Sequence, residues 1–217
     1  MIKILNRENT ILNKFLAEIR DSEIQKDSMR FRRNLERIGE IFAYEISKTL
    51  NYETRLVQTP LGQAELNLIS DKIVLAAILR AALPFHNGFL NYFDDSENAF
   101  ITAYRKYHKD ESFEIKVEYL SSPEIDGKTL IIVDPMLASG ASMVIAVKEI
   151  MKYGTPKHVH IAGIISSVEG IEYIQKHLSG INYTIWTGAV DNELTAKSYI
   201  VPGLGDAGDL AYGRKSD

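Results

Sequence analysis

The chain has 217 residues, a net charge of −4 and no cysteine, and aliphatic and aromatic side chains make up 45% of it. That apolar share is enough for a sizeable core in one domain without a disulfide or metal staple. The missing cysteine excludes a disulfide framework, cysteine-ligated zinc or iron–sulfur sites and a thiol nucleophile. The acidic balance argues against general attraction to nucleic acid.

Residues 1–20 mix charged and apolar side chains and lack the apolar stretch of a signal peptide. No run of about 20 apolar residues occurs, so we expect no transmembrane helix and a cytoplasmic location. The one basic cluster comprises Arg30, Arg32, Arg33 and Arg37. Because glutamates lie beside it in a helical pattern, a solvated helix face or a subunit interface explains it better than a nucleic-acid patch.

The first part of the chain predicts two helices and a hairpin. The helices are expected over residues 10–20 and 28–50, and in the second the apolar residues recur at spacings of three and four to form one stripe. Segments 53–59 and 63–69 flank a turn that contains Pro60, and we expect them to pair as a β-hairpin.

From residue 73 onward, buried strands alternate with helices. The expected strands are 73–79, 99–105, 113–120, 129–133, 157–165 and 182–187, and the expected helices are 84–93, 140–153 and 168–178. This alternation predicts an α/β fold with a central, mostly parallel sheet flanked by helices. In such sheets ligands bind beyond the carboxyl ends of the strands, so the chemistry is expected there.

The segment after strand 129–133 has the composition of a phosphate-binding loop. Its residues are Asp134, Pro135, Met136, Leu137, Ala138, Ser139, Gly140, Ala141 and Ser142. Gly140 lets the backbone approach an anion, the N–H groups of the following helix point at it, and Ser139 and Ser142 add hydroxyl donors. Asp134 stands where it can accept from sugar hydroxyls or help to hold a divalent ion. The alternative is an ordinary strand–loop–helix with serine as the N-cap.

The last fifteen residues are rich in glycine. Pro202, Gly203, Gly205 and Gly208 force a turning backbone with little side-chain bulk. Such a backbone leaves N–H and C=O groups free to pair with a planar ring, and a site that pairs every polar atom of one ring rejects another. A flexible terminus is the alternative, and composition alone does not decide between the two.

Two arginines stand at the carboxyl ends of predicted strands. Arg80 follows strand 73–79, and Arg105 ends strand 99–105. The guanidinium group offers a planar fork of donors that fits phosphate oxygens. For each arginine the alternative is an ordinary ion pair with a nearby carboxylate. On the sequence around each arginine alone, this alternative is favoured over phosphate binding.

The remaining polar features are a loop and a histidine pair. Residues 106–123 predict an exposed hairpin arm. The arm is a lid that excludes water, or else a dimer contact or a plain solvated loop. His108 within it is a minor candidate for contacting an anionic substrate. His158 and His160 alternate on one strand without a third ligand nearby, so no metal site is expected there. Trp186 is assigned to the core.

Two of these segments resemble a known family. Residues 134–142 resemble the motif that binds 5-phosphoribosyl diphosphate (PRPP) in type I phosphoribosyltransferases, most closely that of the uracil branch, because Pro135 replaces the usual second acidic residue. Residues 199–213 resemble the uracil-recognition segment of uracil phosphoribosyltransferases. The resemblance covers nearly the full chain and is weakest over the first 28 residues and residues 85–100. Ala82 departs from the family's frequent glycine, and a glycine-type backbone there would be strained.

The resemblance implies a Mg²⁺-dependent reaction in which N1 of uracil displaces diphosphate from PRPP to give UMP. It implies that Arg80 and Arg105 bind the diphosphate, that residues 135–142 hold the 5-phosphate, and that Asp134 contacts the ribose hydroxyls or metal-bound water. The backbone around Gly205, Asp206 and Ala207 would hold uracil together with Ile200. Asp206 would lie near the ribose and diphosphate, which makes Asp134 and Asp206 the candidate catalytic residues.

We expect one domain over residues 1–217, in which 1–70 and 188–217 form a small hood and 104–123 a hairpin arm. The expected partners are PRPP and uracil, with no nucleic acid or membrane, and the resemblance suggests a homodimer or higher oligomer. GTP activates some members of the family, and the sequence does not show whether it acts here. Two other interpretations remain: a phosphoribosyltransferase for a purine or orotate, and a regulatory protein of the same fold that binds nucleotides or RNA.

Overall fold

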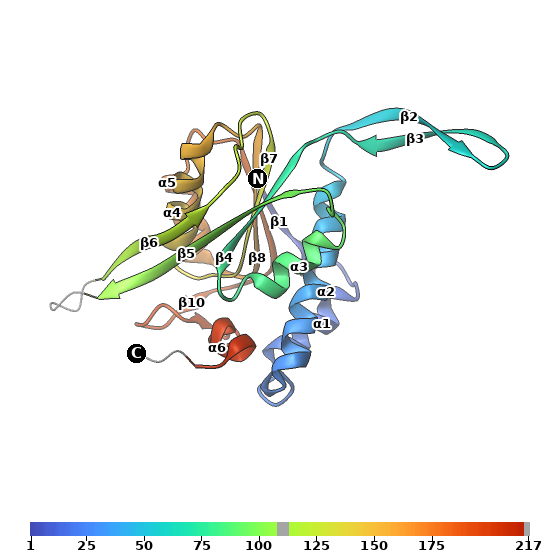
Figure 1. The fold of residues 1–217 in the computed structure, drawn as a ribbon. Helices are drawn as coiled ribbons and strands as arrows, with labels where there is room; N and C mark the ends of the chain where they lie inside the picture. The colour runs from blue at the N-terminus through green and yellow to red at the C-terminus, as the bar shows by residue number, and fades with distance from the viewer. Residues whose placement is uncertain (108–112, 215–217) are drawn as a thin grey trace.

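The fold is built on a seven-stranded sheet in the order β1-β9-β8-β7-β4-β5-β6 (Figure 1). The computed structural model describes residues 1–107 and 113–214, and side chains outside 103–116. The strands of the sheet are β1 (Ile2–Ile4), β4 (Ile73–Leu79), β5 (Glu97–Tyr107), β6 (Phe113–Ser121), β7 (Thr129–Leu137), β8 (His158–Ser167) and β9 (Tyr183–Asp191). Every neighbouring pair is parallel except β5 and β6, which confirms the predicted mostly parallel sheet.

Helices cover both faces of the sheet. The α-helices are α1 (Leu12–Arg20), α2 (Ser28–Ser47), α3 (Leu83–Leu90), α4 (Ala141–Ile150), α5 (Val168–His177) and α6 (Ala207–Tyr212), and 3₁₀ turns span Leu5–Arg7, Ile24–Lys26 and Met151–Tyr153. Helices α1, α2 and α3 pack on one face, and α4 and α5 on the other. The central strands β4, β7, β8 and β9 are therefore buried on both sides over most of their length, which explains the continuous apolar runs in the sequence.

The first face has an aromatic centre. Phe42 of α2 and Phe85 and Phe89 of α3 are fully buried and meet edge to face, with ring centroids 5.2–6.5 Å apart. Edge-to-face packing of aromatic rings adds to the stabilisation from burial alone. This cluster fixes α3, and hence the turn between β4 and α3 that carries Arg80, against the long helix α2.

A hairpin stands apart from the sheet. Strands β2 (Tyr52–Thr59) and β3 (Gly62–Ile69) pair only with each other and project from the upper right of Figure 1, away from α6 and the C-terminus. The predicted hairpin is thereby confirmed. It exposes several apolar side chains, among them Leu56 and Leu61, which are 65% and 100% exposed.

Several elements differ from the sequence-based expectations. Helices α1, α2, α3 and α4 are shorter than predicted, and β5 and β7 are longer. Strand β1 extends the sheet beside β9, and the tail forms β10 (Glu193–Leu194), β11 (Ile200–Val201) and α6, none of which was predicted. These pieces are two to six residues long, too short for hydrophobic periodicity to show. None of the described helices has the length and apolar content to cross a bilayer.

Candidate active site

The predicted phosphate loop begins later than expected, because β7 continues to Leu137. Pro135, Met136 and Leu137 therefore belong to the strand, in which Met136 and Leu137 pair with β8, and the turn comprises Ala138, Ser139 and Gly140. Gly140 has φ of 74° and leads directly into α4. The left-handed conformation favours glycine, so this turn depends on that residue. Ser139, Ala141 and Ser142 are partly exposed at the start of the helix, where an anion can reach their N–H groups.

The first turn of α5 braces this loop. Ser167 Oγ donates to the Ala138 carbonyl at 2.5 Å and accepts from the Gly170 N–H at 2.8 Å. The two backbones are so close that a methyl group at Gly140 would lie 2.5 Å from the Gly170 carbonyl oxygen, and one at Gly170 would lie 2.2 Å from the Ala138 oxygen. Sequence reasoning missed both Ser167 and Gly170. The available signal was a serine directly before the predicted helix 168–178, which is a common N-cap.

Asp134 lies near the carboxyl end of β7, one residue before Pro135. Its Oδ1 accepts the Met136 N–H at 3.2 Å, and the side chain is partly exposed. Burial of the carboxyl group raises the pKa of Asp134 to about 7, and the single backbone hydrogen bond offsets only part of that effect. A carboxyl group with a perturbed pKa at a strand end is typical of a functional site.

Arg80 follows β4, the strand beside β7. The Leu79–Arg80 peptide is cis, and Ala82 has ordinary helical angles of φ −71° and ψ −17°, so the strain expected from the missing glycine does not occur. Arg80 Nη2 donates to the Gly213 carbonyl at 3.2 Å and lies 3.6 Å from Asp209 Oδ1. Its Nε is buried and has no hydrogen-bond partner within the described part of the chain. Arg80 thus reaches toward the C-terminal tail.

Arg105 does not end its strand. Strand β5 runs on to Tyr107, and the Arg105 backbone pairs with Ile115 of β6 in the antiparallel arm, beyond the level at which β4 ends. The Arg105 side chain and all of His108 lie outside the described residues. Strands β5 and β6 pair antiparallel up to Tyr107 and Phe113, and the residues that would connect them in the predicted arm lie outside the described residues.

The glycine-rich tail is an ordered turn followed by a short helix. Strand β11 pairs with β10, the Val201–Pro202 peptide is cis, and Gly203 has φ of 56°. Ile200 and Leu204 are each 4% exposed, whereas Gly205 and Asp206 lie at the surface. Asp206 caps α6 by accepting the Asp209 N–H at 2.9 Å. The turn is therefore anchored by two buried side chains and presents its following residues outward.

The tail and Arg80 meet on one edge of the sheet. A methyl group at Gly208 would lie 3.2 Å from Asp206 Oδ1 and 3.9 Å from Arg80 Nη2. Arg32 of α2 donates to the Ala211 carbonyl at 2.6 Å, which holds α6 against α2. Because β4 and β7 are parallel neighbours, Arg80 and the turn after β7 share the carboxyl edge. The structure thus places Asp134 and Arg80 near the same edge of the sheet and brings Arg80 against the tail around Asp209 and Gly213.

The donor set at this edge suits a magnesium ion that arrives with a phosphorylated substrate. No group of three or more histidine, aspartate or glutamate side chains able to hold a metal ion occurs within the described part of the chain. Mg²⁺ is commonly held by one or two carboxylates together with substrate phosphates and water. Asp134 offers such a carboxylate.

His158 and His160 lie at the amino end of β8, away from the candidate active site. Trp186 Nε1 donates to His160 Nδ1 at 3.1 Å, and the His158 and His160 rings lie 4.5 Å apart. Burial, and then the neighbouring His158, lower the pKa of His160 to about 3, so this ring stays neutral. Trp186 is 3% exposed, which confirms its assignment to the core.

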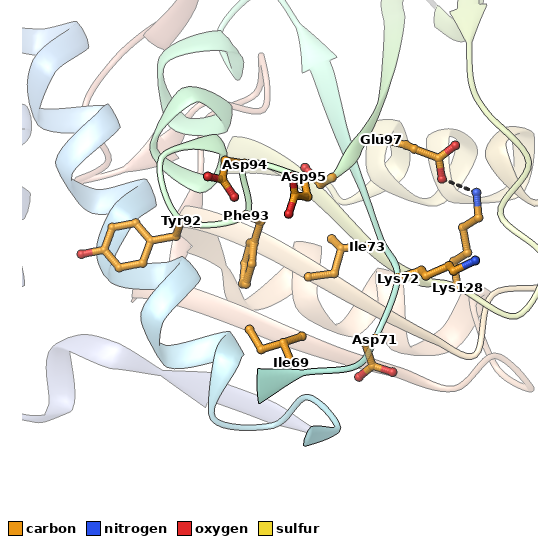
Figure 2. Close-up of a pocket in the computed structure, with 11 residues that line it drawn as sticks. Ile69, Asp71, Lys72, Ile73, Tyr92, Phe93, Asp94, Asp95, Glu97 and Lys128 are labelled. Atoms are coloured by element: carbon orange, nitrogen blue, oxygen red, sulfur yellow. Dashed lines mark hydrogen bonds and ion pairs between the residues drawn. The ribbon is translucent and has the colours of Figure 1, made fainter. Parts of the chain in front are cut away.

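A cavity of about 670 Å³ lies at the amino edge of the sheet (Figure 2). Its lining comes from the start of β4, from the loop between α3 and β5, and from Lys128 beside β7, which forms an ion pair with Glu97. Because β4 runs from this cavity to Arg80, the cavity and the candidate active site lie at opposite ends of the strand. None of the predicted site residues lines it.

The mostly parallel sheet, its flanking helices and the turn after β7 agree with the type I phosphoribosyltransferase fold that the sequence resembles. A family model described as uracil phosphoribosyltransferase matches residues 6–214. The chain belongs to the uracil phosphoribosyltransferase family.

Relatives agree over nearly the whole length. A Porphyromonas gingivalis protein named uracil phosphoribosyltransferase is 56% identical over 211 residues, which are 97% of each chain. One of the same name from Methanothermobacter thermautotrophicus is 39% identical over 219 residues, covering 100% of this chain and 97% of its own. Among solved structures, the AQ2163 protein from Aquifex aeolicus superposes with a TM-score of 0.86 at 31% identity and covers 98% of both chains.

Proposed function

We propose that the carboxyl edge of the sheet holds PRPP and uracil side by side for the reaction of this family, in which they give UMP and diphosphate. The observation that carries the proposal is the contact between Arg80 and the tail, with Arg80 Nη2 3.2 Å from the Gly213 oxygen. It puts a cation suited to diphosphate next to the segment suited to the base. One substrate pair can then span both.

For PRPP, the turn from Ala138 to Gly140 and the start of α4 would hold the 5-phosphate through N–H groups and the hydroxyls of Ser139 and Ser142. A helix start with a left-handed glycine before it is well suited to an anion. Asp134 would accept hydrogen bonds from the ribose hydroxyls. Arg80, with a buried and unpaired Nε, would bind the diphosphate together with Arg105.

For uracil, the backbone of Gly205, Asp206 and Ala207 would pair with the polar edge of the ring, beside Ile200. Uracil has two carbonyl acceptors and two N–H donors. A main-chain clamp that satisfies the two carbonyl groups and N3–H leaves N1 free to react, and it rejects cytosine because the amino group of cytosine places a donor where uracil has an acceptor. Gly205 and Asp206 are exposed, which supports this contact.

In the reaction, N1 of uracil attacks the anomeric carbon while the bond to diphosphate breaks, with inversion at that carbon and a transition state like an oxocarbenium ion. No protein nucleophile is needed, so the residues act by positioning and by stabilising the charge on the departing diphosphate. Mg²⁺ bound with PRPP would supply further neutralisation of that charge. Asp206 is the candidate group to accept the N1 proton.

The chain ends would form a hood over the site. We assign it to residues 1–70 and 188–217, and the packing of α2 against both α1 and α6 supports a link between the two chain ends. The β2–β3 hairpin projects away from α6 (Figure 1). The arm over residues 104–123 would act as a lid or as a subunit contact. We also propose a homodimer or higher oligomer, supported by the exposed apolar side chains of the hairpin.

The test is to mix the purified protein with PRPP, Mg²⁺ and each nucleobase in turn and to separate the products by chromatography. UMP from uracil alone supports the proposal. Nucleotide formed from orotate or a purine instead of uracil would refute it, as would binding of nucleotide or RNA without any turnover. Repeating the uracil reaction with GTP tests whether this chain responds to it, and fractionation of cells tests the expected cytoplasmic location.

A further inference from the structure

A partly buried ion pair holds the turn of the tail. Arg20, the last residue of α1, meets Asp191, the last residue of β9, with Nη1 2.8 Å from Oδ2 and Nη2 2.9 Å from Oδ1. The Asp191 side chain is 8% exposed and that of Arg20 is 23% exposed. A two-pronged arginine–carboxylate pair of this kind fixes orientation as well as distance.

Both members of the pair also hold the backbone of Gly203. Arg20 Nη1 donates to the Gly203 carbonyl at 3.0 Å, and the Gly203 N–H donates to Asp191 Oδ2 at 2.9 Å. Gly203 is in the left-handed region, and a methyl group there would lie 2.1 Å from the Ile200 carbonyl oxygen. The pair therefore satisfies both polar groups of the residue at which the chain turns from β11 toward Gly205.

We propose that Arg20 and Asp191 are positioning residues for base recognition, and that they set the place of the Gly205–Ala207 backbone relative to the sheet. The inference rests on the proposed function, because it assumes that this backbone binds uracil. Neither side chain need touch the substrate. Their effect would reach the base through Gly203, two residues before the proposed clamp.

The chain offers a matched control on the same helix. Glu18 of α1 accepts from Arg30 Nε at 3.1 Å and Nη2 at 2.9 Å, and its side chain is 10% exposed, close to the 8% of Asp191. This second pair joins α1 to α2 and, among the described residues, forms no hydrogen bond with the tail. Glu18→Gln therefore breaks an ion pair whose carboxylate is about as buried as Asp191, although Arg30 at 48% is more exposed than Arg20 at 23%, and it leaves the hydrogen bonds of the turn in place.

The experiment measures the steady-state constants of Asp191→Asn, Arg20→Gln, Arg20→Lys and Glu18→Gln, together with their melting temperatures. We expect KM for uracil to rise about tenfold or more in Asp191→Asn and Arg20→Gln, because small displacements of a positioning group are costly. KM for PRPP should change less than about twofold. Lysine keeps the charge but cannot hold both carboxylate oxygens and the Gly203 carbonyl, so Arg20→Lys should raise KM for uracil by about threefold.

The inference is overturned if KM for uracil is unchanged, if both KM values rise equally, or if Glu18→Gln raises KM for uracil as much as Asp191→Asn does. A drop in melting temperature alone would leave the pair a purely structural one and also overturn it. If Asp191→Asn and Arg20→Gln do not fold, the milder Arg20→Lys is used instead, and an unchanged KM for uracil in that variant overturns the inference. A wild-type protein that forms no UMP would refute the proposed function itself, which keeps the two failures distinct.

Discussion

Arg80 Nη2 lies 3.2 Å from the carbonyl oxygen of Gly213, so a residue at the end of β4 holds the chain 133 positions further on. The same guanidinium lies 3.6 Å from Asp209 Oδ1. Both contacts are partly exposed, and a polyanion that enters the site competes with them for the arginine. Arg80 is thus the point at which the two proposed halves of the site are joined.

Replacing Arg80 by methionine should lower kcat/KM for PRPP about 10- to 150-fold, because a hydrogen bond to a charged group is worth about 1.5–3 kcal/mol. Steady-state kinetics with varied PRPP measure the effect. Arg33→Met is the control, since Arg33 pairs with Glu36 on the exposed side of α2 and should be close to wild type. Equal losses in the two variants would contradict the assignment.

Asp134→Asn should abolish most activity yet stabilise the protein above pH 7. The pKa of Asp134 is raised to about 7 in the folded chain, from an ordinary value of 3.8. Between these pH values the folded state keeps a proton that the unfolded state has lost, so the wild-type stability falls as pH rises through the window. Asparagine removes that penalty, which after allowance for partial solvent contact is about 1–3 kcal/mol.

Thermal melts at pH 8 and pH 3.5 measure this second effect. The variant should melt about 2–10 °C above wild type at pH 8. The difference should largely disappear at pH 3.5, where the Asp134 carboxyl group is mostly protonated in both the folded and the unfolded chain. A variant that melts lower than wild type at pH 8 would contradict the assigned pKa shift.

Gly170→Ala should weaken PRPP binding although Gly170 touches no substrate in the proposed site. An added methyl group would lie 2.2 Å from the Ala138 oxygen, which forces the turn after β7 to move. We expect KM for PRPP to rise about tenfold or more. Gly62→Ala, in the hairpin turn with open space around it, is the matched control and should not change either KM.

Asp206→Asn should cripple UMP formation by about tenfold or more while leaving the fold intact. Asparagine caps a helix about as well as aspartate, so α6 keeps its first turn and the melting temperature should shift by little. Product analysis with uracil, together with a melting curve, tests both halves of the expectation. Full activity in this variant would remove Asp206 from the catalytic residues.

Much of the fold was predictable because its elements are strongly patterned. The apolar run of β4 and the striped helix α2 are long enough for periodicity to identify them, and their alternation predicts the parallel sheet. Strand β1 and helix α6 were not predictable in this way. Both are short, and β1 is stabilised by pairing with β9, which lies some 180 residues away in the chain.

The candidate site was predictable where a motif carries it, as at Asp134 and Gly140. It was not predictable where partners meet only in three dimensions. Ser167 donates a hydrogen bond to Ala138, and Arg20 and Asp191 bind the backbone of Gly203. These contacts join distant segments that have no local sequence signature. Such supporting contacts depend on topology rather than on nearby sequence.

The most direct test of the central claim is a crystal structure of the protein with UMP bound. We predict that the phosphate lies against the turn from Ala138 to Gly140 and the start of α4, and that the uracil ring lies against residues 200–207. UMP bound in the cavity at the amino edge of the sheet, or bound with its base away from the tail, would contradict the account.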